Sequence, residues 1–278
     1  MVRRNQRPLN RLEAELPEGV LVNTAWLKEH GYSRQLLSHY VSAGWLDQPV
    51  RGVYRRPRGP LNWQQVVVSL QTFLDYPLVV GGRTALELLG YAHFLSHKES
   101  QVHLYGPKSP PGWLSHLKLG PQFKYHSDQR LFKNHPVAPE LKKLVGVPAN
   151  TKDSLNLSLT TLPWGQWDWK LVLSTPERAL LELLDELPAH ETFHQVDMLM
   201  HGLTNLSPRR LQTLLADCKS VKVKRLFFFF ADRHAHAWLK PLKKQTFDLG
   251  SGKRLLAKGG KLDHAYQITV PEDLNDLP

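Results

Sequence analysis

Arg34, Gln35, Ser38, His39 and Ser42 are the residues whose types and spacing suggest a chemical task. At about 100° per residue, they fall within one arc of about 140° of a helix, and the opposite arc is mostly apolar. In the major groove, arginine can pair with guanine and glutamine with adenine, while serine and histidine reach bases or phosphates. The pattern predicts a helix that reads double-stranded DNA, although an ordinary amphipathic surface helix has the same pattern.

The segments before this helix would hold it in place. A short helix is predicted over 24–30, and Gly31 and Tyr32 form a turn. Ser33 can cap the second helix, because its side-chain oxygen can accept a hydrogen bond from a free backbone N–H. Gly44 lies where the helix would end, since glycine adopts the left-handed conformation that follows many helices without strain.

A tight two-stranded hairpin is predicted after the helix. Trp45 and Leu46 begin its first strand, Pro49 lies in its turn, and Val53 and Tyr54 form the return strand. Helix, turn, helix and basic hairpin, in this order, indicate a winged helix-turn-helix. The wing carries four arginines that we expect along the DNA backbone, where they position the protein without reading sequence: Arg51, Arg55, Arg56 and Arg58.

The chain begins with a basic leader that contains Arg3, Arg4 and Arg7. This leader is either a flexible arm on phosphate or in a minor groove, or a solvated tail. Apolar residues at Leu9 and Leu12 then space out a first helix, which would support the helix-turn-helix.

The formal net charge of the 278 residues is +11, which favours a polyanionic partner. Residues 1–60 carry ten lysines and arginines against five acidic residues, and residues 217–261 carry twelve against three. Two basic regions imply two anionic contacts or one long contact. The second region predicts a C-terminal basic surface made by Lys219, Lys222, Lys224, Arg225, Lys243, Lys244, Lys253, Arg254, Lys258 and Lys261.

The sequence predicts an α+β fold with two domains. Pro57, Gly59 and Pro60 interrupt the chain after the hairpin, so we divide it into a winged helix-turn-helix domain at 1–58 and a larger mixed α/β domain at 59–278. Strands are expected at 78–80, 101–105, 254–256 and 266–270, with several short ones between 121 and 175. Helices are expected at 62–74, 83–89, 176–187, 192–201, 208–215 and 221–238.

Composition excludes several classes of protein. A hydrophobic content of 41% indicates a globular chain, and no apolar run is long enough to span a membrane. The first residues lack an apolar signal core, so we expect a cytoplasmic protein. The single cysteine, Cys218, excludes an intramolecular disulfide and a cysteine-based zinc cluster.

No catalytic, cofactor-binding or metal-binding residue is predicted. The glycine-rich segment 250–254 lacks the nucleotide-binding signature, because Phe247 stands at the first required glycine and Arg254 at the magnesium ligand. Asp232, His234 and His236 could suggest a metal, but alternate residues of a helix point about 200° apart. They cannot chelate together unless the helix has already ended.

Several separate motifs resemble the AbiEi family of bacterial antitoxins. In the N-terminal half these are GWLDQPVRGVYRRP, then Trp63-Gln64-Gln65, and then VVGGRTALELLGY. In the C-terminal half they are SVKVKRLFFFFADRHAHAWLKPL and LGSGKRLLAKGGKLDHAYQITVP. The resemblance implies a winged helix-turn-helix domain that represses its own antitoxin–toxin operon by binding promoter repeats. It also implies that the domain at 59–278 counteracts a nucleotidyltransferase-like toxin of the AbiEii type, usually without a stable toxin complex.

Two other functions compete with this one. A stand-alone winged-helix transcription regulator would use its C-terminal domain to sense a ligand or partner, and it would lack a toxin gene beside its own. A nuclease would need clustered acidic residues for metal, yet residues 217–261 contain only Asp217, Asp232 and Asp248. The C-terminal basic surface could contact flanking DNA, RNA connected with the toxin's substrate, or an acidic partner.

Overall fold

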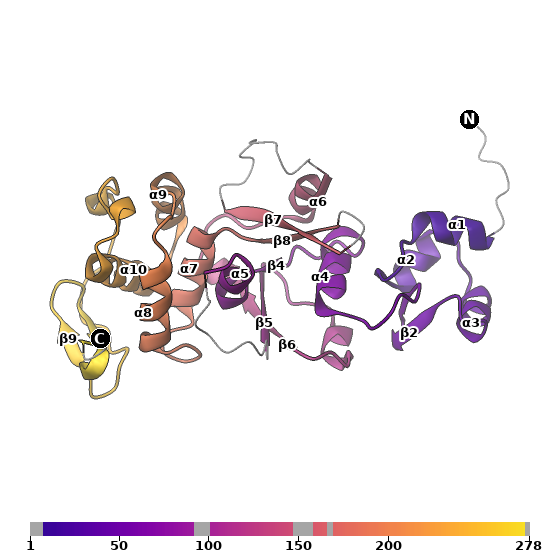
Figure 1. The fold of residues 1–278 in the computed structure, drawn as a ribbon, viewed down its shortest axis with the longest axis horizontal. Helices are drawn as coiled ribbons and strands as arrows, with labels where there is room; N and C mark the ends of the chain where they lie inside the picture. Colours follow the sequence, from indigo (N-terminus) through magenta and orange to yellow (C-terminus); the bar gives the residue numbers. More distant parts are fainter. Residues whose placement is uncertain (1–7, 92–100, 147–157, 166–168, 276–278) are drawn as a thin grey trace.

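The computed structural model describes residues 8–91, 101–146, 158–165 and 169–275 (Figure 1). It is elongated, with the N-terminal helices at one end and the hairpin that contains β9 at the other (Figure 1). A mixed sheet with its covering helices lies between these ends. The two basic regions of the sequence therefore belong to opposite ends of the molecule.

The N-terminal unit is a winged helix-turn-helix, as predicted. Its elements follow the order α1 (Pro8–Glu15), β1 (Leu21–Asn23), α2 (Thr24–Glu29), α3 (Arg34–Ser42), β2 (Asp47–Val50) and β3 (Val53–Arg55). The strands form an antiparallel sheet in the order β1-β3-β2. Helices α2 and α3 form the helix-turn-helix, and β2 and β3 form the wing.

The wing differs from the predicted hairpin in three details. Strand β1 was not expected, because three residues are too few to show an alternating pattern. Trp45 and Leu46 precede the first wing strand instead of beginning it. Pro49 lies inside β2, and the turn falls at Arg51 and Gly52. Strand β2 is at the sheet edge, where a proline without an N–H does not break the pairing.

A separate hydrophobic cluster holds the winged helix together. Leu12 and Leu16 from the first helical segment meet Leu27 of α2 and Leu37 and Tyr40 of α3, all buried. Burial of these apolar side chains fixes the helices against one another. The remaining buried members of this cluster are Val20, Val22, Tyr32 and Leu46.

A five-stranded mixed sheet forms the middle of the molecule, in the order β6-β5-β4-β8-β7 (Figure 1). Strands β4 and β8 are parallel, as are β5 and β6, whereas β4–β5 and β7–β8 are antiparallel. The strands are β4 (Val79–Val80), β5 (Gln101–Gly106), β6 (Gln122–Ser127), β7 (Leu159–Trp164) and β8 (Trp169–Ser174).

Helices pack on this sheet. Helix α4 lies against β8 and α6, while α5 lies against β5 and α7. Their bounds are α4 (Trp63–Thr72), α5 (Gly82–Leu88), α6 (Ala138–Gly146) and α7 (Pro176–Asp185). Short 3₁₀ turns at η1 (Gly112–His116) and η2 (Asp128–Arg130) lie before and after β6.

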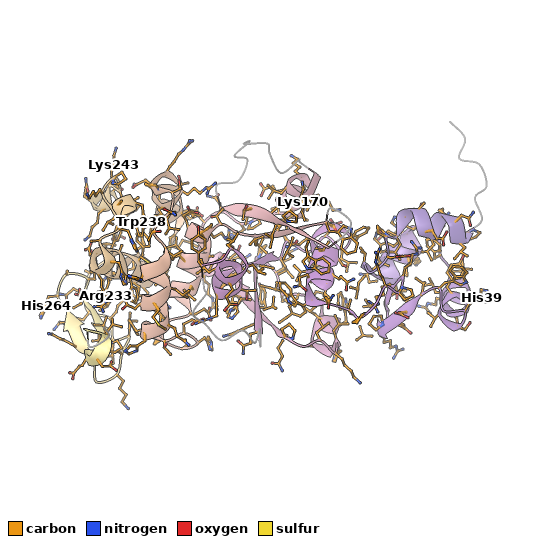
Figure 2. All side chains as sticks on the ribbon, in the orientation of Figure 1. His39, Lys170, Arg233, Trp238, Lys243 and His264 are labelled. Carbon is orange, nitrogen blue, oxygen red and sulfur yellow. The ribbon has the colours of Figure 1, made fainter. Side chains whose placement is uncertain are left out.

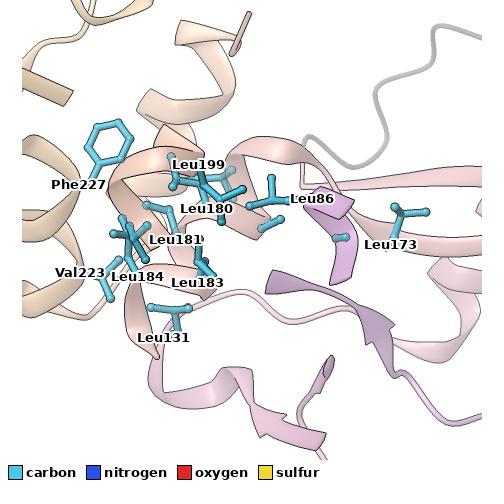
Figure 3. Close-up of a cluster of buried hydrophobic side chains, with 14 of the residues drawn as sticks. Leu86, Leu131, Leu173, Leu180, Leu181, Leu183, Leu184, Leu199, Val223 and Phe227 are labelled. Carbon is cyan, nitrogen blue, oxygen red and sulfur yellow. The ribbon is translucent and has the colours of Figure 1, made fainter. Parts of the chain in front are cut away.

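Three further helices extend the core beyond α7: α8 (Phe193–Gly202), α9 (Pro208–Asp217) and α10 (Val221–His234). Leucines of α7 meet Leu199, Val223 and Phe227 in one buried cluster (Figure 3). Three of the four consecutive phenylalanines of α10 are buried, so this helix is central to the C-terminal core. The last elements are η3 (Ala237–Leu239), η4 (Lys244–Thr246), β9 (Lys261–Asp263), β10 (Ile268–Val270) and η5 (Glu272–Asn275).

Two predictions for this part are wrong. Helix α10 ends at His234 instead of residue 238, because Ala235 adopts a left-handed conformation with φ of 48°. Residues 254–256 are not a strand, since only Arg254 forms an isolated bridge to Ile268. Strand β9 instead pairs with β10.

Strand β1 and helix α4 join the winged helix to the body. The backbone N–H of Leu21 donates to the Ser69 hydroxyl over 2.8 Å, and both groups are buried. Trp169 of β8 packs against the hydrophobic clusters of both units. The division between residues 58 and 59 stays a prediction.

Candidate nucleic-acid interface

Helix α3 begins and ends as its sequence predicts. The Ser33 hydroxyl accepts a hydrogen bond from the backbone N–H of Leu36 over 3.3 Å, which caps the first turn. At the other end, Gly44 has φ of 76°, a conformation that costs glycine little. Leu37 and Tyr40 are buried beneath the helix and fix which face points outward.

All five residues predicted to read DNA are exposed on α3: Arg34, Gln35, Ser38, His39 and Ser42. The Ser42 hydroxyl donates to the His39 carbonyl over 2.9 Å, so it is partly engaged within the helix. Figure 2 shows His39 at the outer end of the winged helix. The structure thus presents a continuous polar face that no described element covers, while its contact with DNA stays a prediction.

The wing arginines do not form the free cationic edge that the sequence predicts. Of these four arginines, only Arg51 is exposed, at the turn between β2 and β3. Arg55 is 8% exposed, and one of its guanidinium nitrogens donates to Asp47 over 3.1 Å and to the Gly59 carbonyl over 2.9 Å. Because β3 is the central strand, this side chain lies within the fold. The expected exposure of Arg55 is wrong.

The next two arginines connect the wing to the end of α1. Arg56 donates to the Leu16 carbonyl over 3.1 Å and lies 3.5 Å from Glu18. Arg58 lies 3.4 Å from the other Glu18 oxygen. These exposed and half-buried ion pairs partly neutralise the positive charge of the wing. The wing therefore offers less free positive charge to a DNA backbone than the sequence predicts. Arg3 and Arg4 lie outside the described residues.

An arginine that the sequence reasoning missed holds the turn of the helix-turn-helix. Arg11 of α1 donates to the His30 carbonyl and, over 3.4 Å, to the Tyr32 hydroxyl. Its guanidinium also lies over the Tyr32 ring, 4.8 Å from the centroid. Burial raises the pKa of Tyr32, so its hydroxyl stays protonated and donates to Glu15. The four-residue spacing of Arg11 and Glu15 on one helix was the available signal.

The predicted C-terminal basic surface is only partly a surface. Arg225 is 2% exposed and donates to the carbonyls of Leu249, Gly252 and Gln267 over 2.6, 2.7 and 3.3 Å. Lys224 is also buried. The prediction that these α10 residues face outward is wrong, because the core encloses this part of the helix.

Two more lysines of this set are engaged. Lys222 donates to the Leu187 carbonyl and lies 3.2 Å from Asp185. Lys244 lies 3.2 Å from Asp232 and contacts the Tyr266 hydroxyl. Figure 2 shows Lys243 at the end of the molecule opposite His39. The members that are exposed are Lys219, Lys243, Lys253, Arg254, Lys258 and Lys261.

The two rejected ligand sites have instructive geometry. Because α10 ends at His234, the rings of His234 and His236 lie nearly parallel with centroids 5.8 Å apart, not on opposite sides. Their Nε2 atoms bond to Asp197 over 2.7 Å and to the Met200 carbonyl over 2.8 Å. No group of three potential ligands that could hold a metal ion occurs among the described residues.

The glycine-rich segment 250–254 is organised around a cation. The carbonyls of Leu249 and Gly252 accept from Arg225, so carbonyl oxygens, which would repel phosphate, converge in this loop.

Burial raises the pKa of the Cys218 thiol to about 11, which leaves it protonated and unreactive at neutral pH. In the described part of the chain, no helix is long and apolar enough to cross a membrane.

Two family models together match most of the chain. A family model described as "Transcriptional regulator, AbiEi antitoxin N-terminal domain" matches residues 5–97. A second, described as "Transcriptional regulator, AbiEi antitoxin, Type IV TA system", matches residues 99–271. The junction between the two models lies later in the chain than the domain boundary predicted from sequence.

The fold is shared with a solved structure. The crystal structure of RV2827C protein from Mycobacterium tuberculosis superposes with a TM-score of 0.57 over 94% of this chain and 89% of that chain. The two sequences are 17% identical, so the likeness is one of fold. No curated protein matches the chain significantly.

Proposed function

Because the chain belongs to the AbiEi family of transcriptional-regulator antitoxins of type IV toxin–antitoxin systems, we propose that it binds double-stranded DNA upstream of its own gene through α3. The observation that carries this proposal is the exposed polar face of α3, which Leu37 and Tyr40 orient from beneath. In winged helix-turn-helix proteins the second helix of the motif enters the major groove.

Individual side chains of α3 have separate tasks in this proposal. Arg34 pairs with guanine and Gln35 with adenine, while Ser38, His39 and Ser42 contact neighbouring bases or phosphates. Arg51 at the wing turn contacts the phosphate backbone and supplies affinity without base preference. Arg3 and Arg4 would add backbone contacts beyond the first helix.

Binding at the promoter would make the protein a repressor of the operon that encodes it and its toxin. The C-terminal domain then serves the second task, counteracting a nucleotidyltransferase-like toxin. The exposed members of the C-terminal basic surface, such as Lys243, lie at the end opposite α3, which supports separate tasks for the two regions (Figure 2). A stand-alone regulator would share the DNA-binding half and lack the toxin.

A reporter gene placed behind the DNA upstream of this gene tests the repressor half. The wild-type protein should lower reporter expression, and Arg34→Ala/Gln35→Ala should restore it. A matched double variant, Arg209→Ala/Gln245→Ala, removes the same side-chain types from exposed positions of the C-terminal domain and should repress normally. Repression by the α3 variant at the wild-type level would refute the assignment of α3.

Co-expression with the toxin encoded beside the gene tests the antitoxin half. Cells that produce the toxin should recover growth when the wild-type protein is supplied from a separate promoter. The α3 double variant should rescue growth equally well, because the rescue in this experiment does not depend on repression of the operon. Failure of the wild-type protein to rescue would leave a transcription regulator without antitoxin activity.

A further inference from the structure

A cleft of about 580 Å³ lies where the winged helix meets the body of the molecule. One wall comes from α1, α2 and the turn after α2, and the other from the end of α4 and from α6. It is lined by Glu15, Trp26, Glu29, His30, Thr72, Phe73, Asp75 and Lys142. A ligand seated here would contact the DNA-reading unit and the body at once.

Two aromatic residues that line the cleft are in contact with each other. Trp26 of α2 stacks on the His30 ring with centroids 3.7 Å apart, which fixes the indole in place. The Phe73 ring meets Trp26 edge to face at 6.4 Å. Indole and phenyl faces attract a cation placed over them, and they also provide the apolar contact that small-molecule sites use.

The charges of the cleft have the opposite sign to the protein as a whole. Glu15, Glu29 and Asp75 supply three carboxylates, whereas Lys142 is the one lysine or arginine among the lining residues and is paired with Asp75. Elsewhere the chain carries a large cationic surplus. Carboxylates concentrated beside aromatic rings in such a protein select a cationic ligand and reject anions.

The wall formed by the winged helix is also the support of the helix-turn-helix. Glu15 accepts a hydrogen bond from the Tyr32 hydroxyl over 3.4 Å and lies 3.8 Å from Arg11. The His30 carbonyl accepts from the same Arg11 guanidinium. A cation in the cleft would compete with Tyr32 and Arg11 for Glu15. This competition would weaken the contacts that hold the turn before α3.

We propose that this cleft binds a small organic cation, an amine or guanidinium attached to an apolar group, and that its occupation alters the placement of α3. The apolar group packs against the parts of Trp26 and Phe73 that line the cleft, and the cation is paired by Glu29 and Glu15. Ligand binding itself is independent of the proposed function. Its effect on DNA binding rests on that function.

Calorimetric titration with three compounds of equal size tests the proposal. Phenethylamine carries a cation, 2-phenylethanol is neutral, and phenylacetate carries an anion on the same phenyl group. Saturable binding of phenethylamine alone at millimolar concentration is expected. No saturable binding of phenethylamine, or equal binding of all three compounds, would overturn the proposal.

Variants locate the site. Glu29→Gln and Trp26→Ala should each weaken phenethylamine binding about three- to tenfold, because the first removes a partner of the cation and the second a contact of the apolar group. Glu272→Gln removes an exposed carboxylate from the far C-terminal end and should bind like the wild type. Thermal melting checks that Trp26→Ala is folded, and the exposed Glu29→Gln provides an independent result if it is not. Unchanged affinity in Glu29→Gln would overturn the proposed site.

The effect on α3 is measured with the DNA upstream of the gene. Saturating phenethylamine should change the affinity of the wild type for this duplex at least about twofold, and Glu29→Gln should need about three- to tenfold more phenethylamine for the same change. Calorimetric titration with phenethylamine in the absence of DNA distinguishes a failure of the proposed function from a failure of the control of α3. A protein that binds phenethylamine but never this DNA refutes the proposed function alone, and one that binds both without coupling refutes control of α3 alone.

Discussion

The two basic regions of this chain differ in whether the cations on their helices are exposed or buried. In the N-terminal region, α3 leaves Arg34 exposed without a side-chain hydrogen bond or ion pair among the described residues. In the C-terminal region, α10 directs Lys224 and Arg225 inward, and Arg225 bonds to three backbone carbonyls. The C-terminal region has the larger surplus of cations in its sequence, yet no lysine or arginine among the described residues of α10 is exposed, whereas α3 exposes Arg34.

The difference follows from how each helix is covered. Helix α3 packs through one face on a small cluster, so its polar face stays in water. Helix α10 has Phe227, Phe228 and Phe230 buried on several sides, which leaves few positions open to solvent. A cation on such a helix must find an acceptor inside the fold, because an unpaired buried charge is very costly. The formal charge of a segment therefore predicts a binding surface for anions only where it is known which of its charged residues are buried.

The largest expected effect concerns the buried face of α3. Leu37→Ala should lower the free energy of unfolding by ~2–5 kcal/mol, because it leaves a cavity under the helix. Leu36 lies at the half-buried edge of the same helix, so Leu36→Ala should cost less. Chemical denaturation of both variants measures the difference. Equal stability of Leu37→Ala and the wild type would mean that the faces of α3 are misassigned.

Arg225→Met should destabilise the C-terminal domain by ~1.5–3 kcal/mol, because buried carbonyls lose a charged donor. Arg254→Met changes an exposed neighbour in the same loop and serves as its control. Thermal unfolding should separate the two variants clearly. If both melt like the wild type, Arg225 is a surface charge after all and the contrast between α3 and α10 disappears.

On α3 itself the expected effect lies in binding and not in stability. Arg34→Ala and Gln35→Ala should each weaken binding to the upstream DNA by ~1–3 kcal/mol and relax base preference at one position. Duplexes with single base-pair changes identify that position for each variant. A uniform loss of affinity across all of these duplexes would assign the two side chains to phosphate contacts.

The wing offers a paired comparison between Arg51 and Arg55. Arg51→Ala should weaken binding to all duplexes alike and reduce the salt slope by about 1, with little change in stability. Arg55→Ala should lower the melting temperature instead, because the buried guanidinium bonds to Asp47 and to Gly59. The opposite pattern, with Arg55→Ala changing only the salt slope, would mean that the wing rearranges on DNA.

The smallest expected effect is that of an exposed C-terminal cation. Lys253→Ala should change the free energy of unfolding by less than ~0.5 kcal/mol, in contrast to Arg225→Met. Chemical denaturation of the two variants side by side measures this. A loss as large as that of Arg225→Met would show that the loop depends on Lys253 as well.

Local patterns predicted much of the fold correctly. The 3.6-residue periodicity located α3. Its ends were located by Ser33 and Gly44, because helix caps depend on neighbouring residues alone. Strand β1 was missed because three residues carry no period. The end of α10 was missed because Ala235 gives no sequence signal for the left-handed conformation it adopts.

The partners of charged side chains were the least predictable part of the candidate interface. Arg56 bonds to Leu16 and Glu18, and Arg11 bonds to His30, across long separations in sequence. Such contacts depend on tertiary packing that no local spacing reveals. The sequence therefore identified the exposed face of α3, where packing does not intervene, and overestimated the free charge of the wing and of α10.

Binding by fluorescence anisotropy to the upstream DNA and to a random duplex of equal length, at about 150 mM salt, tests the central claim that α3 reads the DNA. The wild type and Arg209→Ala/Gln245→Ala should prefer the upstream duplex. Arg34→Ala/Gln35→Ala should lose that preference and keep its affinity for random DNA. If the α3 variant retains the preference, or loses affinity for both duplexes equally, α3 does not read the sequence.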